Sequence, residues 1–188
     1  MQLEEAIKKR KSVTRYLDKK PDWRKIIQSM DEARYAPNAD GTSAIKFILV
    51  SNEEKIQELK EATQQSFVGT AKYIVILVSD DSKLIQKYDD RGKRYSSLQA
   101  GAAIQNFLLS LTEKKLVTKW VKYFDDEKVK RLFEIPENLS IEGIFPIGLE
   151  TKIKTKEERK TRLENLVYFE KWGNSKMTPH TRISLENS

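Results

Sequence analysis

One stretch near the middle of the chain limits the fold more than any other. Residues 98–116 read Leu-Gln-Ala-Gly-Ala-Ala-Ile-Gln-Asn-Phe-Leu-Leu-Ser-Leu-Thr-Glu-Lys-Lys-Leu. A broad apolar face recurs at helical spacing from Ile104 to Leu111, and the small residues from Ala100 to Ala103 allow another backbone to approach closely. A helix this apolar must be buried, so we predict a long core helix here.

Shorter apolar runs on either side of this helix predict strands. The run 73–78 is nearly all β-branched or bulky apolar residues, which is typical of a central strand buried on both faces. Three further runs, 46–50, 118–123 and 141–149, are each too short for a helix or alternate in polarity, and we expect a strand at each.

Several further segments carry helical patterns. We expect helices over 3–10, from Pro21-Asp22 onward with apolar positions up to Ala33, over 53–62, and from the acidic run 125–127 to near Pro136. Helices that separate apolar strands around a long buried helix indicate an α/β or α+β sandwich.

Length and composition fit one domain. A chain of 188 residues with 38% apolar content buries one substantial core, and we expect a single domain over 1–170. We expect residues 171–188 to be a C-terminal extension that lies over the partner subunit or frays. The chain has no Cys and a single His, His180, which excludes disulfides and predicts no metal centre. The charged N-terminus and the absence of any run of about 18 apolar residues predict a cytoplasmic protein with no membrane partner.

The formal charge of +7 has two explanations: a surface that follows nucleic-acid phosphates, or one that attracts smaller anions such as a flavin phosphate. The most basic segments, 89–95 and 152–162, are interrupted by acidic residues and carry no aromatic-basic motif. We therefore expect solvated loops there and no nucleic-acid partner.

The order of short motifs resembles one known family. Residues 10–16, Arg-Lys-Ser-Val-Thr-Arg-Tyr, resemble the Arg-Arg-Ser-x-Arg-x-Phe opening of nitroreductase-like flavoproteins, and residues 33–38 resemble their Ala-x-x-Ala-Pro-Ser. Residues 101–109 resemble the family's central helix. Matches to later family motifs follow in family order at Ile135-Pro136, Ile147-Gly148 and residues 163–167. The resemblance therefore covers nearly the whole chain.

This resemblance implies an α/β (α+β) sandwich with an antiparallel-rich central sheet flanked by helices, assembled as an intertwined homodimer with FMN at its interface. It also implies an oxidoreductase that moves hydride from NADH or NADPH to an electron-poor small molecule, such as a quinone or nitroaromatic, by a ping-pong mechanism. The flavin carries the redox chemistry, so no catalytic side chain is required.

The resemblance also assigns site residues. Guanidinium and hydroxyl donors suit a phosphate dianion, and Arg10, Lys11 and Ser12 would hold the phosphate and the pyrimidine side of the flavin. Thr14 stands where the family often has Arg or Lys. The remaining candidates are Pro37, Asn38, Ala39, Gly41 and Ser43 from the partner subunit, Lys122 and Tyr123 beside the reactive ring nitrogen, and Arg159 or Lys160 as a C-terminal phosphate ligand.

The chain departs from the family pattern at three places. Residues 41–45, Gly-Thr-Ser-Ala-Ile, replace Asn-x-Gln-Pro-Trp; Lys115-Leu116-Val117 replaces Gly-Leu-Gly; and Tyr123 replaces a frequent glycine. The first change removes amide side chains that bond the flavin. A flavin-free family member that serves as a dimeric structural or regulatory protein therefore remains an alternative.

Overall fold

The computed structural model describes residues 1–151 and 160–176. The chain divides into two compact units, residues 1–155 and 156–188. Within the described residues, no helix has both the length and the apolarity needed to cross a membrane.

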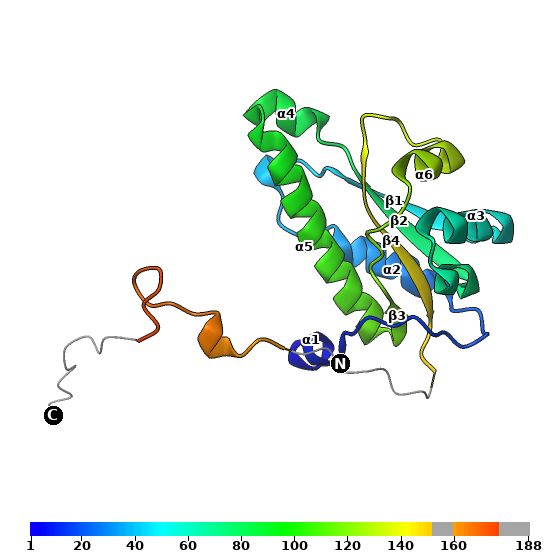
Figure 1. Cartoon of the computed structure of the whole chain (residues 1–188), viewed down its shortest axis with the longest axis horizontal. Helices are drawn as coiled ribbons and strands as arrows, with labels where there is room; N and C mark the ends of the chain where they lie inside the picture. The colour runs from blue at the N-terminus through cyan, green and yellow to red at the C-terminus, as the bar shows by residue number, and fades with distance from the viewer. Residues whose placement is uncertain (152–159, 177–188) are drawn as a thin grey trace, which may run out of the picture. The chain divides into compact units, whose positions relative to one another are not determined.

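The first unit is built on one antiparallel sheet, as predicted (Figure 1). Its strands are β1 (Ile45–Val50), β2 (Tyr73–Ser79), β3 (Leu116–Thr118) and β4 (Ser140–Leu149), in the spatial order β1-β2-β4-β3. The central place of β2 confirms the prediction for residues 73–78. Its side chains alternate between two cores, with Val75 in one and Ile76 in the other, and both are fully buried.

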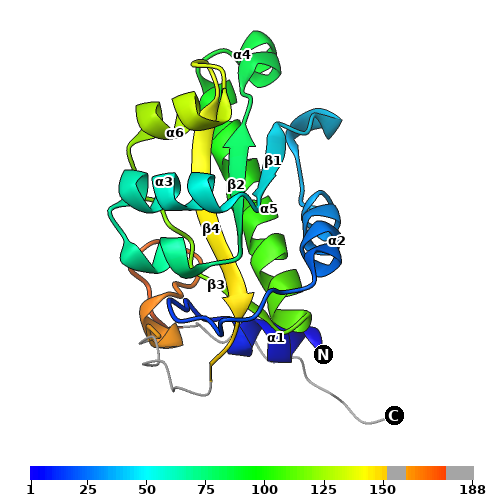
Figure 2. The same ribbon diagram turned by 90° about the vertical axis from the view of Figure 1, so that its right-hand side faces the viewer.

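Helices cover both faces of this sheet (Figure 2). One face carries α2 (Trp23–Ala33) and α5 (Arg91–Glu113), with α1 (Leu3–Lys9) and α4 (Ser82–Tyr88) packed against α5; the other carries α3 (Glu53–Thr63), the short η2 (Ser66–Thr70) and α6 (Asp126–Phe133). Asn52 and Asp125 cap α3 and α6 by accepting hydrogen bonds from the backbone N–H groups of Lys55 and Lys128. The sandwich expected from the sequence is confirmed.

The long helix begins earlier than predicted. It starts at Arg91 instead of Leu98, so the expectation of a solvated loop over 89–95 is wrong, and α4 has no counterpart among the predicted helices. Gly92 explains the difference, because a Cβ at this position would overlap the backbone of Leu84 and Ile85 in α4. The absence of a side chain at Gly92 thus lets α4 and α5 approach closely.

The predicted strand over 118–123 is also wrong, since β3 spans only 116–118. In the antiparallel register, Lys119 would face Pro146, which has no N–H to donate. The pairing resumes only as a single bridge between Val121 and Ile144, whose backbones exchange hydrogen bonds of 2.9 and 3.0 Å. Trp120 therefore lies between β3 and this bridge, outside regular strand pairing.

The described residues of the second unit, 160–176, contain a short 3-10 helix, η3 (Leu163–Asn165). Leu163 and Leu166, which belong to the last of the family-like motifs, are exposed within this unit. The rings of Tyr168 and Trp172 form an edge-to-face pair with centroids 4.9 Å apart.

Candidate functional site

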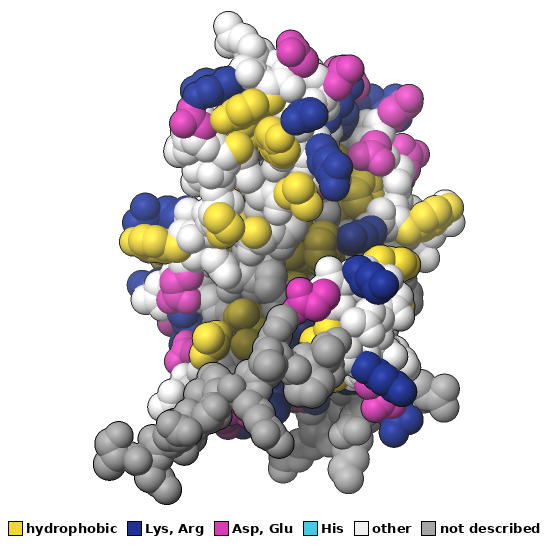
Figure 3. Space-filling view, turned by 90° about the vertical axis from the view of Figure 1, so that its left-hand side faces the viewer, with side chains coloured by type: hydrophobic (Ala, Val, Ile, Leu, Met, Phe, Trp, Pro, Cys, Tyr) yellow, Lys and Arg dark blue, Asp and Glu magenta, His cyan; other side chains and the backbone are white. Residues whose placement is uncertain are grey.

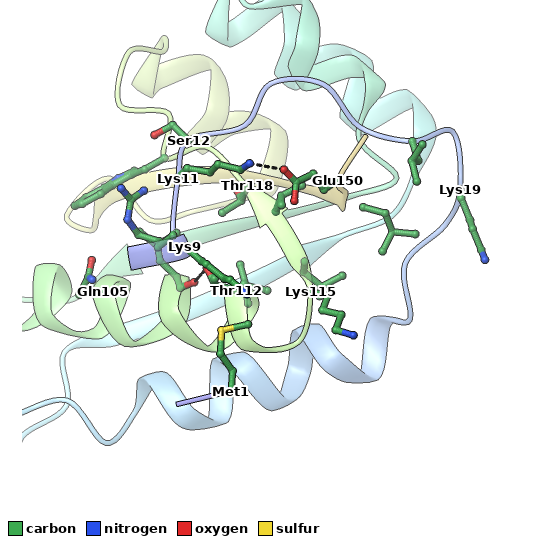
Figure 4. Close-up of a pocket in the computed structure, with 18 residues that line it drawn as sticks. Met1, Lys9, Lys11, Ser12, Lys19, Gln105, Thr112, Lys115, Thr118 and Glu150 are labelled. Carbon is green, nitrogen blue, oxygen red and sulfur yellow. Dashed lines mark hydrogen bonds and ion pairs between the residues drawn. The ribbon is translucent and has the colours of Figure 1, made fainter. Parts of the chain in front are cut away.

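A pocket of about 910 Å³ opens where the segment after α1 passes the C-terminal half of α5 and β3 (Figure 4). This volume lies in the range of small-molecule and cofactor sites. Predicted site residues Arg10, Lys11 and Ser12 all line it, together with Gln105 and Thr112 of α5. The structure thus brings the first predicted group together around one concave space.

Backbone contacts fix this first group of residues. Ser12 forms a parallel bridge with Thr118, and the N–H of Val13 donates to the Thr118 carbonyl at 3.0 Å. Val13 is 1% exposed and anchors the segment in the core. Lys11 pairs with Glu150 at the end of β4, as the dashed line in Figure 4 marks. The chain after α1 is therefore held as an extra edge beside β3.

Tyr16 ties the same segment to β4. Its hydroxyl lies 3.0 Å from the Val13 carbonyl and 3.2 Å from the Pro146 carbonyl, to which it donates, and burial raises the pKa of this phenol. The ring lies directly over Gly148, where a Cβ would overlap it. Tyr16 thus stays neutral and acts as a structural anchor for the wall of the pocket.

Thr118 is a pocket residue that the sequence did not single out. It is 5% exposed, it lines the pocket, and its Oγ1 has no hydrogen-bond partner among the described residues. Buried hydroxyls in proteins are nearly always satisfied, because an unpaired one costs about 1–3 kcal/mol. Thr118 therefore places a buried, unsatisfied hydroxyl in the wall of the pocket.

Cations dominate the rim of the pocket. Lys9, Arg10, Lys19 and Lys115 line it along with the Lys11–Glu150 pair, so the lining has an excess of positive charge. Lys115 has a φ of 61°, a left-handed conformation that favours glycine. This is the first position of the segment that replaces Gly-Leu-Gly, so the chain keeps the backbone shape of a glycine while presenting a lysine.

The second predicted group lies elsewhere. Pro37, Asn38 and Ser43 line a small recess beside Gln99 and Ala103, near the other half of α5, and Ala39 and Gly41 belong to the adjoining η1 (Ala39–Gly41). None of these residues lines the large pocket of the same chain. One chain alone therefore does not join the two groups.

Gln99 holds this second segment in place, which the sequence did not foresee. With its carboxamide oriented to satisfy both partners, Nε2 donates to the Thr42 carbonyl at 3.1 Å and Oε1 accepts from the Ala39 N–H at 3.0 Å. Asp40 and Gly41 have φ values of 53° and 70°, and Asp40 pairs with Lys87. A buried amide thus supports a strained turn.

Neither residue of the third predicted pair, Lys122 and Tyr123, lines the large pocket, and only Lys122 contacts a residue that does. Lys122 places its ammonium 3.9 Å from the Trp120 ring centroid, and Trp120 itself lines the large pocket. Trp120 also donates from its indole N–H to the Glu142 carbonyl at 2.9 Å. Tyr123 is 72% exposed, and its carbonyl accepts from Gln65 at 3.4 Å.

The last candidates lie apart from the pocket lining. Thr14 is half-buried and does not line the pocket. Arg159 lies outside the described residues, and Lys160 is an exposed residue of the C-terminal unit.

Comparisons with known proteins give the family. The model of the nitroreductase family matches residues 7–68 and 60–149. A candidate NADH dehydrogenase/NAD(P)H nitroreductase of Methanothermobacter thermautotrophicus is 28% identical over 152 residues, which cover 79% of this chain and 77% of the relative.

Solved structures agree on the fold. A nitroreductase family protein from Clostridium difficile 630 has a TM-score of 0.79 and 27% identity, covering 91% of this chain and 99% of that one. An iodotyrosine deiodinase bound to FMN and 3-iodo-L-tyrosine has a TM-score of 0.74 and 23% identity, covering 86% and 96%. The matched residues include β1, β2, α5 and the Arg10 to Ser12 wall of the pocket, and on this basis the chain belongs to the nitroreductase family.

Proposed function

We propose that this protein is an FMN-dependent oxidoreductase that takes hydride from NADH or NADPH and reduces an electron-poor small molecule of the quinone or nitroaromatic type. The observation that carries the proposal is the pocket itself, whose lining includes Arg10, Ser12 and Thr118. Support also comes from the family and from the FMN in the related iodotyrosine deiodinase.

The lining of the pocket fits FMN. A phosphate dianion requires cations and hydroxyl or N–H donors, which Arg10, Lys11 and Ser12 supply on one wall. We expect the Thr118 hydroxyl, which has no partner among the described residues, to form a further hydrogen bond to a polar edge of the ligand. Leu108 and Trp120 supply apolar and aromatic surface for a flat ring.

Bound FMN would supply the redox chemistry, accepting hydride from the nicotinamide and passing the electrons to the acceptor in a second half-reaction. The residues of the chain would bind the flavin and hold it in a fixed orientation. The segment from Arg10 to Val13 is pinned to β3, so its donors are held in place before the ligand arrives. No side chain is needed as an acid or nucleophile, and substrates alternate in one site, which is a ping-pong mechanism.

We further propose that two chains complete each site. Hydrophobic side chains gather on the side of the molecule where α5 lies (Figure 3), and in α5 itself Leu98 is 60% exposed while Gly101 has open space around it. A second copy packed on α5 would bring the partner's segment from Pro37 to Ser43 to the pocket. This arrangement accounts for the separation of the two predicted groups within one chain.

The departures from the family pattern reduce the number of flavin contacts. Gly41 and Ser43 offer no amide side chain, so we expect the backbone of this turn, held by Gln99, to make the contacts there. Losing two hydrogen bonds of about 1 kcal/mol each weakens binding by roughly one to two orders of magnitude. A tight flavin site tolerates such a loss.

Anaerobic mixing of the FMN-loaded protein with NADH or NADPH tests the proposal. We expect the absorbance of oxidised flavin to disappear after NADH or NADPH is added. It should return when a quinone is then added in the absence of oxygen. FMN that binds but is not reduced by either nucleotide would refute the oxidoreductase. A protein that excludes FMN would favour the flavin-free structural or regulatory alternative.

A further inference from the structure

A second hollow adjoins the pocket, and the proposed FMN site does not account for it. Its volume is about 660 Å³, and it is formed mainly by the segment that leads into α2. We call it the basic hollow; its lining is Lys19, Lys20, Pro21, Asp22, Trp23, Arg24, Lys25, Tyr73, Leu116 and Leu149. Lys19, Leu116 and Leu149 line the large pocket as well, so the two spaces are neighbours.

The charge of the basic hollow is strongly one-sided. Four cationic side chains face a single carboxylate, Asp22. That carboxylate is already engaged as the cap of α2, accepting from the Arg24 N–H at 3.0 Å. Lys19, Lys20 and Lys25 form no ion pair with any residue in the described ranges. Unpaired like charges gathered on one surface attract a multivalent anion.

Aromatic surface accompanies these cations. Trp23 is 46% exposed at the start of α2, with the Arg24 guanidinium 5.1 Å from its ring. The Lys20 ammonium lies 5.1 Å from the ring of Tyr73. A half-exposed indole offers a face for stacking a base, and ammonium groups beside it suit a phosphate. Such a combination recognises a phosphorylated nucleoside.

The segment is also held in a defined shape. The Leu17 N–H donates to the Leu149 carbonyl at 3.0 Å, and the Lys19 N–H donates to the Leu17 carbonyl at 2.7 Å. Pro21 is buried, and Asp22 caps the helix that follows. The lysines therefore extend from an ordered backbone beside the large pocket.

We propose that the basic hollow binds the adenosine 2′-phosphate end of NADPH, which makes NADPH the preferred hydride donor. This inference rests on the proposed function, because the nicotinamide end would then lie in the adjoining pocket. NADH and NADPH differ only by the 2′-phosphate, and this group gives the unpaired lysines a partner. Removing one charge-assisted hydrogen bond to the phosphate weakens binding about tenfold.

Nucleotide binding, measured by isothermal titration calorimetry on the full chain, tests the inference without any need for flavin. We expect adenosine 2′,5′-bisphosphate to bind at least about tenfold more tightly than adenosine 5′-monophosphate. Lys20→Gln/Lys25→Gln should remove this preference, since neither lysine lines the large pocket. The matched control, Lys55→Gln/Arg131→Gln, removes the same charge from exposed residues of α3 and α6 on the other face of the sheet and should keep it.

Steady-state kinetics then separates the two proposals. We expect the ratio of kcat/KM for NADPH over NADH to fall by about tenfold or more in Lys20→Gln/Lys25→Gln, with the NADH value unchanged. Equal binding of the two adenosine nucleotides, or a preference that disappears equally in the control, would overturn the inference while leaving flavin reduction intact. A retained nucleotide preference without flavin reduction would instead refute the oxidoreductase and leave the 2′-phosphate site standing.

Discussion

Gly143 of β4 lies directly beneath the indole of Trp120, so close that a Cβ on Gly143 would overlap the indole Nε1. The same indole N–H donates to the Glu142 carbonyl at 2.9 Å, and its ring lies 6.0 Å from that of Phe145. A glycine on the sheet thus makes room for the aromatic side chain that lines the large pocket.

Gly143→Ala should therefore displace Trp120 and lower the free energy of unfolding by about 1–3 kcal/mol, the usual cost of overpacking. Chemical denaturation measures the loss, and quenching of tryptophan fluorescence by a small solute reports the movement of the indole. Gly69→Ala is the control, because the new methyl group there meets the flexible end of Lys60 and should cost less. Equal losses in both variants would contradict this role for Gly143.

Thr118→Val should change protein stability and FMN affinity in opposite directions. Valine has a similar shape but no hydroxyl, so we expect the flavin-free protein to gain about 1 kcal/mol in stability while FMN affinity falls about tenfold. Ser96→Ala is a matched control, because Ser96 is also buried with an unsatisfied hydroxyl but does not line the pocket. Thermal denaturation and FMN titration should show a stability gain in both variants and weaker FMN binding only in Thr118→Val.

Gln99→Leu should loosen the turn from Ala39 to Thr42. The change leaves the Ala39 N–H and the Thr42 carbonyl without their partner, which we expect to cost about 1–3 kcal/mol. Hydrogen exchange at the Ala39 amide should accelerate, and FMN affinity should fall if the partner's turn contacts the flavin. Gln99→Glu keeps the acceptor for Ala39 and should retain its slow exchange. An unchanged exchange rate at the Ala39 amide in Gln99→Leu would exclude the proposed hydrogen bonds from Gln99 to this turn.

The ion pair between Glu32 of α2 and Lys114 after α5 predicts a pH dependence. The Lys114 ammonium lies 2.7 Å from the carboxylate, and its hydrogen bond lowers the pKa of Glu32 below the usual value. Because the folded pKa is depressed, the contribution is complete above the unfolded pKa and is lost as pH falls through the folded pKa.

Glu32→Gln should consequently cost about 0.5 kcal/mol at pH 7, as is typical of a partly exposed pair, and nothing once the wild-type carboxyl is protonated in acid. Urea denaturation of both proteins at neutral and acidic pH checks this convergence. If the difference in free energy of unfolding between the two proteins is the same at both pH values, the ion pair does not stabilise the fold.

The sequence predicted the elements whose signal is local. The buried run of β2, the helices α3 and α6, and the apolar face of α5 each follow from a pattern within one segment. The family resemblance likewise identified Arg10 and Ser12, which line the pocket, from a short motif. These features depend on neighbours within a few residues, which a sequence pattern records.

The errors and omissions depend on contacts between distant segments. Gly92 lies in the first turn of α5, where α4 packs against it, and the antiparallel register places Pro146 opposite the residue that follows β3. The burial of the Thr118 hydroxyl and the hydrogen bonds from Gln99 to the turn at Ala39 and Thr42 likewise depend on segments that are distant in the sequence. No local pattern marks a threonine in a strand or a glutamine in a helix for such roles.

FMN binding to the purified protein is the measurement that decides whether the pocket holds a flavin. After excess FMN is added and unbound flavin removed, we expect a yellow protein with the absorbance bands of oxidised flavin, one FMN per chain, and weakened binding in Arg10→Ala. A colourless protein that rejects FMN would contradict the flavin site and leave only the nitroreductase fold.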